Sequence, residues 1–157
     1  MNGLLEIPIK KQIDDQMHSA EHLLNQAMVR RFDCERCFSA HIERKKSKCD
    51  YRFDRPLTDA ELKSLENDVN GVIESDLRVS ERYISVDSAR EQFNLSRLPE
   101  DAGALIRIVS IGDYDHCPCI GPHVTATGGI GTFHITSSGF ENGVLRIRFR
   151  LKRPTAG

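Results

Sequence analysis

The sequence predicts an α+β fold, in which a largely antiparallel sheet packs against two long helices. Two segments, 14–31 and 58–75, carry apolar residues at helical spacing. The C-terminal segment instead alternates apolar and basic residues after an Asn-Gly pair, a pattern typical of a β-hairpin. Long helices combined with antiparallel hairpins indicate the α+β class. We expect residues 1–157 to form a single domain, since this length can bury a proper core.

Composition and charge exclude several classes of protein. Hydrophobic residues make up 39% and charged residues 29% of the chain, as in an ordinary soluble domain. The net charge of -1 argues against a generally cationic coat, so any RNA contact must come from local basic patches. We expect no membrane span and no signal peptide, because no apolar run is long enough. Five cysteines without a secretory signal indicate free thiols in a reducing cytoplasm.

The first helix is expected to run from Asp14 or Asp15 to Arg31. Aspartates suit the cap and the first turn, and arginines suit the last turn. The apolar stripe of this helix consists of Met17, Ala20, Leu23, Leu24, Ala27 and Met28. His18 and His22 lie one turn apart on nearly the opposite face. A pair of this kind is usually half-exposed on the surface, but a Cys-x3-His pair elsewhere in the chain favours a ligand role.

The segment 32–50 is rich in cysteine. Cys34 and Cys37 form a CxxC pair, which is followed by His41 and Cys49. These residue types would suit a second zinc site. Structural zinc sites usually show two clean ligand pairs, so we favour a hairpin or loop with free thiols.

The middle of the chain is expected to alternate between strands and helices. Thr58 and Glu61 have the spacing of a capping box, which predicts the start of the second helix. The other expected elements are an extended lead-in at 1–12, a strand end at 51–54, a strand at 77–86, a short helix from a cap at Asp87 to about Phe93, a loop at 94–103, and strands at 104–111 and 131–136.

A thiol and an imidazole, Cys119 and His123, lie four positions apart in the turn-rich segment 119–130. Glycine and proline fix the backbone between them, so both side chains can point at one spot. Three imidazoles and one thiolate are a suitable tetrahedral set for zinc. We therefore predict one zinc ion per chain, held by His18, His22, Cys119 and His123.

The last strand is expected to follow a hairpin turn at 138–143, and its residues alternate between two kinds. The residues expected in the core are Leu145, Ile147, Phe149 and Leu151. The residues expected on the opposite face are Arg146, Arg148, Arg150 and Lys152. This basic face is either a solvated surface or a ridge that contacts phosphates, as in tRNA.

The two ligand pairs and their flanking residues resemble the editing domain shared by alanyl- and threonyl-tRNA synthetases, and its free-standing AlaX-type trans-editing form. The segments that carry the resemblance are 18–24, 51–54, 57–62, 69–70, 111–119, 128–133 and 143–147. Between the cysteine and the histidine of the second pair, Ile120-Gly121-Pro122 looks more like the threonyl form, which is not generally regarded as zinc-dependent. No family motif matches 34–49.

The resemblance implies a cytoplasmic zinc-dependent hydrolase that deacylates mischarged aminoacyl-tRNA. Ser-tRNA of the Ala or Thr type is the expected substrate, and no ATP is expected. The chain is too short to hold a synthetase catalytic domain beside the editing unit, so we expect it to act in trans. The metal would act through a bound water or position the amino acid.

Three further residues, Ser39, His41 and His116, are candidates for the substrate pocket, and His134 is a candidate for a supporting role. Two alternatives stay open. One is a non-catalytic, zinc-stabilised tRNA- or RNA-binding module on the same fold. The other is a hydrolase of small aminoacyl or amide substrates that does not require tRNA.

Overall fold

The computed structural model describes residues 13–96, 98 and 104–154, and it has the predicted α+β architecture. The expected lead-in at 1–12 lies outside the described residues, as does most of the expected loop at 94–103. None of the described helices is long and apolar enough to cross a membrane. The elements in chain order are α1 (Asp15–Phe32), β1 (Ser39–Ile42), β2 (Ser47–Arg52), α2 (Asp59–Glu74), β3 (Val79–Ser85), α3 (Val86–Gln92), β4 (Leu105–Ile111), β5 (Asp115–Pro118), the 3₁₀ turn η2 (Thr127–Ile130), β6 (Thr132–Glu141) and β7 (Val144–Lys152).

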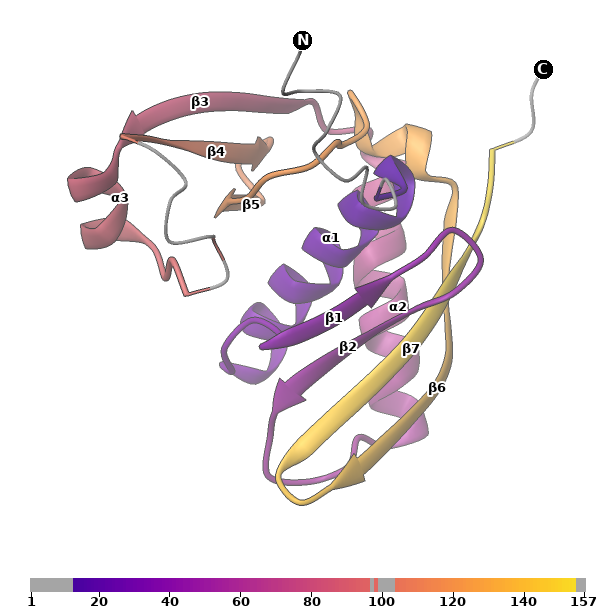
Figure 1. The fold of residues 1–157 in the computed structure, drawn as a ribbon. Helices are drawn as coiled ribbons and strands as arrows, with labels where there is room; N and C mark the ends of the chain where they lie inside the picture. Colours follow the sequence, from indigo (N-terminus) through magenta and orange to yellow (C-terminus); the bar gives the residue numbers. More distant parts are fainter. Residues whose placement is uncertain (1–12, 97, 99–103, 155–157) are drawn as a thin grey trace, which may run out of the picture.

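The strands form two antiparallel sheets. The larger sheet has the order β1-β2-β7-β6, and the smaller has the order β3-β4-β5. Helices α1 and α2 lie side by side against the larger sheet, while α3 lies next to the smaller one (Figure 1). Helix α1 also contacts β5, so it lies between the two sheets. This central position explains why α1 can carry a site that the rest of the chain completes.

Helix α1 begins and ends close to the predicted residues. The Asp14 side chain caps it by accepting a hydrogen bond from the Met17 N–H. Asp33 ends it in the left-handed region at φ 54° and donates its N–H to the Val29 carbonyl. The polar face, however, is not on the surface: His18 is 5% exposed and His22 is 3% exposed. The alternative of half-exposed surface histidines is therefore wrong, because the helix is covered on both faces.

Helix α2 begins with the predicted capping box. The Glu61 N–H donates to the Thr58 hydroxyl (3.1 Å), and the Thr58 N–H donates to the Glu61 carboxylate (2.9 Å). One face of the helix enters the main core through Leu65, Val69 and Ile73. Local capping and periodic burial are thus enough to place this helix.

The C-terminal hairpin has the predicted core face but a shorter turn. Leu145, Ile147 and Phe149 are fully buried, and Leu151 is 9% exposed. Strand β6 continues to Glu141, so the turn at 142–143 replaces the longer one predicted at 138–143. Asn142 and Gly143 have φ values of 51° and 78°, which suits a tight two-residue hairpin. Because the Asn-Gly pair alone makes this turn, β6 is longer than the predicted strand at 131–136.

The predicted cap of the short helix is wrong by two residues. The Ser85 hydroxyl, rather than Asp87, accepts the hydrogen bond that caps α3, from the Ser88 N–H (3.1 Å). Strand β3 is also shorter than the predicted strand at 77–86. Leu77 is tied instead to Thr127, whose hydroxyl and N–H bond the Leu77 backbone. These tertiary bonds are not visible in local patterns.

Strand β6 lies at the edge of the larger sheet, and side chains of α2 hydrogen-bond some of its outward-facing backbone groups. The Asn70 amide donates to the Phe133 carbonyl (2.9 Å) and accepts from the Phe133 N–H (2.8 Å). The Ile135 N–H donates to the Glu66 carboxylate (2.8 Å). Open strand edges invite pairing with other chains, and these side chains cover part of this edge. Asn70 thereby fixes the sheet against the helix layer.

The double bond of Asn70 to β6 leads to a stability prediction. The Asn70→Ala variant should lower the free energy of unfolding by about 1–3 kcal/mol, because it leaves two backbone groups of Phe133 without partners. Asn67 is an exposed residue of the same helix, so Asn67→Ala is the matched control and should be nearly neutral. Urea unfolding followed by circular dichroism measures both. Equal stability of the two variants would contradict the role assigned to Asn70.

Candidate metal centre

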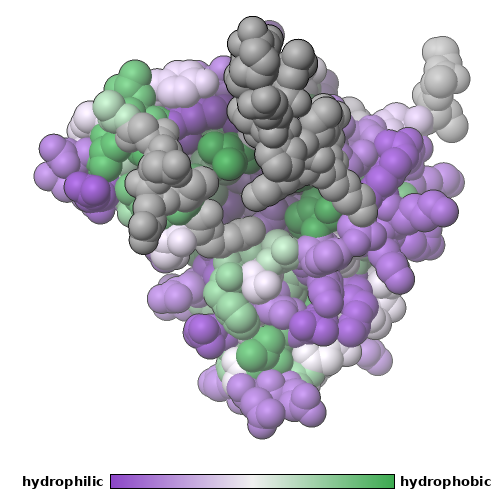
Figure 2. Space-filling model, in the orientation of Figure 1, coloured by the Kyte–Doolittle hydropathy of each residue, from purple (hydrophilic) through white to green (hydrophobic). Residues whose placement is uncertain are grey.

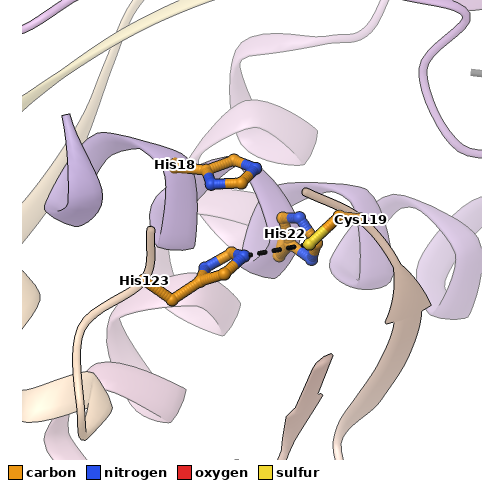
Figure 3. A group of neighbouring side chains, drawn as sticks. All are labelled: His18, His22, Cys119 and His123. Atoms are coloured by element: carbon orange, nitrogen blue, oxygen red, sulfur yellow. Dashed lines mark hydrogen bonds between the residues drawn. The ribbon is translucent and has the colours of Figure 1, made fainter. Parts of the chain in front are cut away.

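Two segments about a hundred residues apart bring their side chains to one place (Figure 3). His18 and His22 come from α1, and Cys119 and His123 come from the loop after β5. One ligand atom from each of the four lies within 4.8 Å of the others. The Cys119 sulfur is 3.2 Å from His123 Nε2, and the His18 and His123 rings stack with centroids 4.1 Å apart. The structure thus brings together the four residues that the sequence singled out.

The loop 119–123 approaches α1 closely. Gly121 has φ 109°, and a Cβ on this residue would lie 3.2 Å from His18 Cε1. A side chain at this position would therefore strain the backbone and press on the imidazole. The Arg107 guanidinium donates to the carbonyls of Gly121 (2.7 Å) and Cys119 (3.4 Å), which holds the loop from the side of β4.

Two of the imidazoles are oriented by bonds at their Nδ1 atoms. His18 Nδ1 donates to the Pro122 carbonyl (2.9 Å), which leaves Nε2 as the atom with a free lone pair. His123 Nδ1 bonds the Ser19 hydroxyl (2.9 Å), and this hydroxyl also accepts the Val124 N–H (3.1 Å). Ser19, between the two histidines of α1, thus links the helix to the loop. Outer bonds of this kind fix the tautomer and direction of histidine ligands.

His22 faces a buried carboxylate. Its Nδ1 lies 3.5 Å from Asp115 Oδ2, too long for a regular hydrogen bond, and this buried nitrogen is otherwise unsatisfied among the described groups. Asp115 is fully buried and accepts from Arg36 Nη1 (2.6 Å) and Gln26 Nε2 (2.9 Å). Burial alone raises the pKa of Asp115, but His22 and Arg36 lower it by more, so the carboxylate stays ionised.

The protonation states of His18 and His123 suit metal binding. Burial, together with repulsion from His22, lowers the pKa of His18 to about 4. Burial and the other two histidines lower the pKa of His123 to about 2. Both imidazoles are therefore neutral at pH 7 and offer lone pairs. Burial raises the pKa of the Cys119 thiol to about 12, so a cation beside the sulfur would be needed to make it a thiolate.

The donor set fits zinc. Neutral imidazole nitrogens and a cysteine sulfur are the usual ligands of Zn²⁺, commonly four in number. The buried Nδ1 of His22 opposite the Asp115 carboxylate matches the carboxylate–histidine pair often found behind a metal ligand. The cluster is also closed from most sides, since Cys119 is 9% exposed and His123 is half-buried.

The other predicted pocket residues lie elsewhere. In the sheet register Ser39 pairs with Asp50 and His41 with Lys48, on the face of the larger sheet that points away from α1. The His41 ring is 64% exposed and contacts Glu43. His116 is exposed on β5, where it bonds the Ser110 hydroxyl (2.7 Å). The geometry does not support a pocket role for these residues beside the four-residue cluster, and that role stays a prediction.

The predicted hairpin over 32–50 forms from β1 and β2. Cys34 donates to the Met28 carbonyl, and His41 points to solvent, so the four-ligand knuckle does not assemble. Cys37 and Cys49 are instead buried together with Glu21 of α1. Sequence spacing offered no sign that a residue between His18 and His22 would join them.

Four residues around the cluster were not predicted from the sequence: Ser19, Arg36, Arg107 and Asp115. Ser19 and Asp115 lie within or beside the two motifs, but a serine or an aspartate carries no signal of its own there. Arg36 and Arg107 act through tertiary contacts, which no local pattern reveals.

The basic face of β7 contains one arginine that is already ion-paired and three exposed basic residues. The Arg146 guanidinium makes a two-pronged ion pair with Asp50 (2.7 and 2.9 Å), so its charge is balanced. Arg148, Arg150 and Lys152 are exposed, and Arg148 lies directly opposite Lys48 of β2. Figure 2 shows hydrophilic side chains gathered over the side of the molecule that this sheet forms. We call Lys48, Arg148, Arg150 and Lys152 the basic ridge.

Comparisons with known proteins show which family the chain resembles. The family model described as "Threonyl and Alanyl tRNA synthetase second additional domain" matches residues 106–148, which include Cys119 and His123. The chain is also similar to alanine–tRNA ligases. It is 31% identical to that of Idiomarina loihiensis in an alignment 154 positions long, which covers 88% of this chain and 17% of the ligase.

Two further alanine–tRNA ligases show the same extent of similarity. The ligase of Coxiella burnetii is 35% identical over 83% of this chain and 15% of its own length. The ligase of Leptospira biflexa is 33% identical over 78% of this chain and 13% of its own length. The chain thus spans a small part of these relatives, and the match extends over most of its own residues. The chain belongs to the editing-domain family of alanyl- and threonyl-tRNA synthetases.

Proposed function

We propose that the protein hydrolyses mischarged aminoacyl-tRNA in trans, with Ser-tRNA of the Ala or Thr type as its substrate and zinc as its cofactor. The observation that carries this proposal is the convergence of His18, His22, Cys119 and His123 on the scaffold of an editing-domain family. The relatives are named as alanine–tRNA ligases, which supports a tRNA substrate. The bond to be broken is the ester between the amino acid and the terminal ribose.

The residues around the cluster would hold the reacting groups in place. His18 keeps one tautomer through Pro122, and His123 is held through Ser19, so their lone pairs are directed into the cluster. When bound, zinc would supply Lewis-acid stabilisation of the developing oxyanion, or hold the amino acid in position. The ionised Asp115 behind His22 favours a positive charge in this buried place. Because these groups are already oriented, they need to reorganise little during the reaction.

The basic ridge would contact the phosphates of the tRNA. Lys48 and Arg148 lie directly opposite each other on adjacent strands, and like charges in this arrangement destabilise a sheet. An anionic backbone laid across the pair would relieve that repulsion. Arg146 does not join this surface, because Asp50 already balances it. Phosphate contacts add affinity with little sequence preference.

A deacylation panel tests the proposed activity. Ser-tRNA(Ala) and Ser-tRNA(Thr) should lose their serine well above the spontaneous rate, and correctly charged Ala-tRNA(Ala) should not. The Cys119→Ala variant should lose most of the activity, because one of the four ligands is removed. Cys34→Ser is the matched control, since that thiol bonds the Met28 carbonyl and not the cluster; it should keep the activity.

The absence of turnover on both seryl-tRNAs and on Gly-charged tRNA would refute the deacylase. Tight tRNA binding without turnover would select the non-catalytic RNA-binding module on the same fold. Hydrolysis of small aminoacyl esters that tRNA does not inhibit would instead select a hydrolase that does not require tRNA.

The carboxylate behind His22 leads to a prediction about metal affinity. Asp115→Asn removes a buried charge that faces the ring, and loss of such outer partners typically lowers metal affinity by about 10–100-fold. Asp113 is an exposed aspartate two residues earlier, so Asp113→Asn is the control and should bind as the wild type does. Competition with a chromophoric zinc chelator measures both affinities. An unchanged affinity in folded Asp115→Asn would show that Asp115 serves only to pair Arg36.

The basic ridge leads to a prediction about salt dependence. The double variant Arg148→Ala/Arg150→Ala should weaken the binding of all tRNAs alike. It should also flatten the logarithmic salt dependence by about one for each phosphate that the protein no longer neutralises. Arg82→Ala, which removes an exposed arginine of the smaller sheet, is the control. Filter binding across salt concentrations measures this, and an unchanged slope in the double variant would mean that the ridge is only a solvated face.

A further inference from the structure

A second group of possible metal ligands lies beside the first and belongs to none of the functions discussed so far. It consists of Glu21 from α1, Cys37 just before β1, and Cys49 from β2. One ligand atom of each lies within 4.8 Å of the others. All three residues are buried, with exposed fractions of 3%, 2% and 0%. Two cysteines and a carboxylate from three separate segments therefore meet in the interior.

We propose that Glu21, Cys37 and Cys49 form a second binding site for a thiophilic divalent cation such as Zn²⁺. This site is separate from the histidine cluster. It also differs from the zinc knuckle considered for the cysteine-rich segment, because Glu21 takes the place of Cys34 and His41. The three residues offer sulfur and carboxylate ligands that zinc accepts, and a water in the fourth position would complete a tetrahedron, as in zinc sites with three protein ligands.

The distances suit this assignment. The Cys37 sulfur is 3.5 Å from Glu21 Oε2. With a Zn–S bond of about 2.3 Å and a Zn–O bond of about 2.1 Å, tetrahedral geometry separates the two ligand atoms by about 3.6 Å. The same distance also suits a weak hydrogen bond from the thiol to the carboxylate, so only a binding experiment separates the two states. In both, the three side chains are already in place.

The walls of the site keep its ligands in position. The Asn25 side-chain carbonyl accepts from the Cys37 N–H (3.2 Å) and from the Tyr51 hydroxyl (2.7 Å). Tyr51 is fully buried, and burial raises its pKa well above the ordinary value, so it remains a neutral donor. Cys49 is fixed by the pairing of β2 with Ile147 of β7 and Ala40 of β1. A site held by such bonds loses little freedom when it binds an ion.

Charge also favours a cation here. A carboxylate and two thiolates would be three anions close together in an apolar interior. Such a group is stable only when a cation lies among them. The Arg36 guanidinium, held by Asp115, lies within electrostatic range of Glu21 and would balance the remaining negative charge. A bound ion would fasten the β1–β2 hairpin to the part of α1 that carries His18 and His22.

Cobalt binding tests this site without interference from the first one. In a His18→Ala/Cys119→Ala background the first site has lost its only thiolate, so any thiolate-to-Co²⁺ charge-transfer absorption must come from other cysteines. We expect this background to bind one Co²⁺ per chain with such absorption, and the wild type to bind two. Adding Cys37→Ser should abolish the band. Adding Cys34→Ser, the matched control from the same CxxC pair, should keep it.

Folding measurements and a milder variant distinguish loss of the site from loss of the fold. Circular dichroism and thermal unfolding identify any variant that does not fold. Glu21→Gln keeps the side-chain volume and both thiols, and it should weaken Co²⁺ binding at least tenfold in the same background. The proposal is overturned if the folded background shows no thiolate–Co²⁺ band, if Glu21→Gln binds unchanged, or if Cys34→Ser and not Cys37→Ser removes the band. Deacylase activity plays no part in these readouts, so their outcome is independent of the proposed function.

Discussion

The structure depends on the burial of a polar helix face. Helix α1 lies between two sheets, so His18, Ser19 and His22 are buried like its apolar stripe, with exposed fractions of 5%, 0% and 3%. Buried polar groups need partners, and an isolated helix offers none on this face. Those partners come from β5 and the loop after it, namely Asp115, the Pro122 carbonyl and His123. The hydrogen bonds that His18 and Ser19 make to this loop therefore also fix the position of Cys119 and His123.

This arrangement separates the two surfaces that the proposed function requires. The histidine cluster lies on the side of α1 that faces β5, whereas the basic ridge lies on the face of the larger sheet that points away from α1. A tRNA that contacts both must have its phosphates on the ridge while its single-stranded 3′ end bends around the edge of the sheet. Of the four residues only His123 is half-buried rather than buried, so the ester would approach the cluster from its side.

Local patterns predicted the elements, and tertiary contacts decided what the patterns could not. The Asp14 cap, the Thr58–Glu61 capping box and the alternation of β7 were predictable, because each depends on residues a few positions apart. The pairing of two ligand motifs was also predictable, since spacing and residue type indicate metal chemistry. The Ser85 cap, the Asp50–Arg146 ion pair and the turn limited to 142–143 were not. Nor was the meeting of Glu21 with Cys37 and Cys49, because it needs the hairpin to fold back onto α1.

The proposed zinc ion would join α1 to the loop after β5. The most direct test is diffraction from crystals of zinc-loaded protein at the zinc absorption edge. If zinc binds there, we expect an anomalous peak enclosed by His18, His22, Cys119 and His123. It should lie about 2.0–2.1 Å from the nitrogens and about 2.3 Å from the sulfur. A well-ordered cluster of these four side chains with no anomalous peak among them would contradict it.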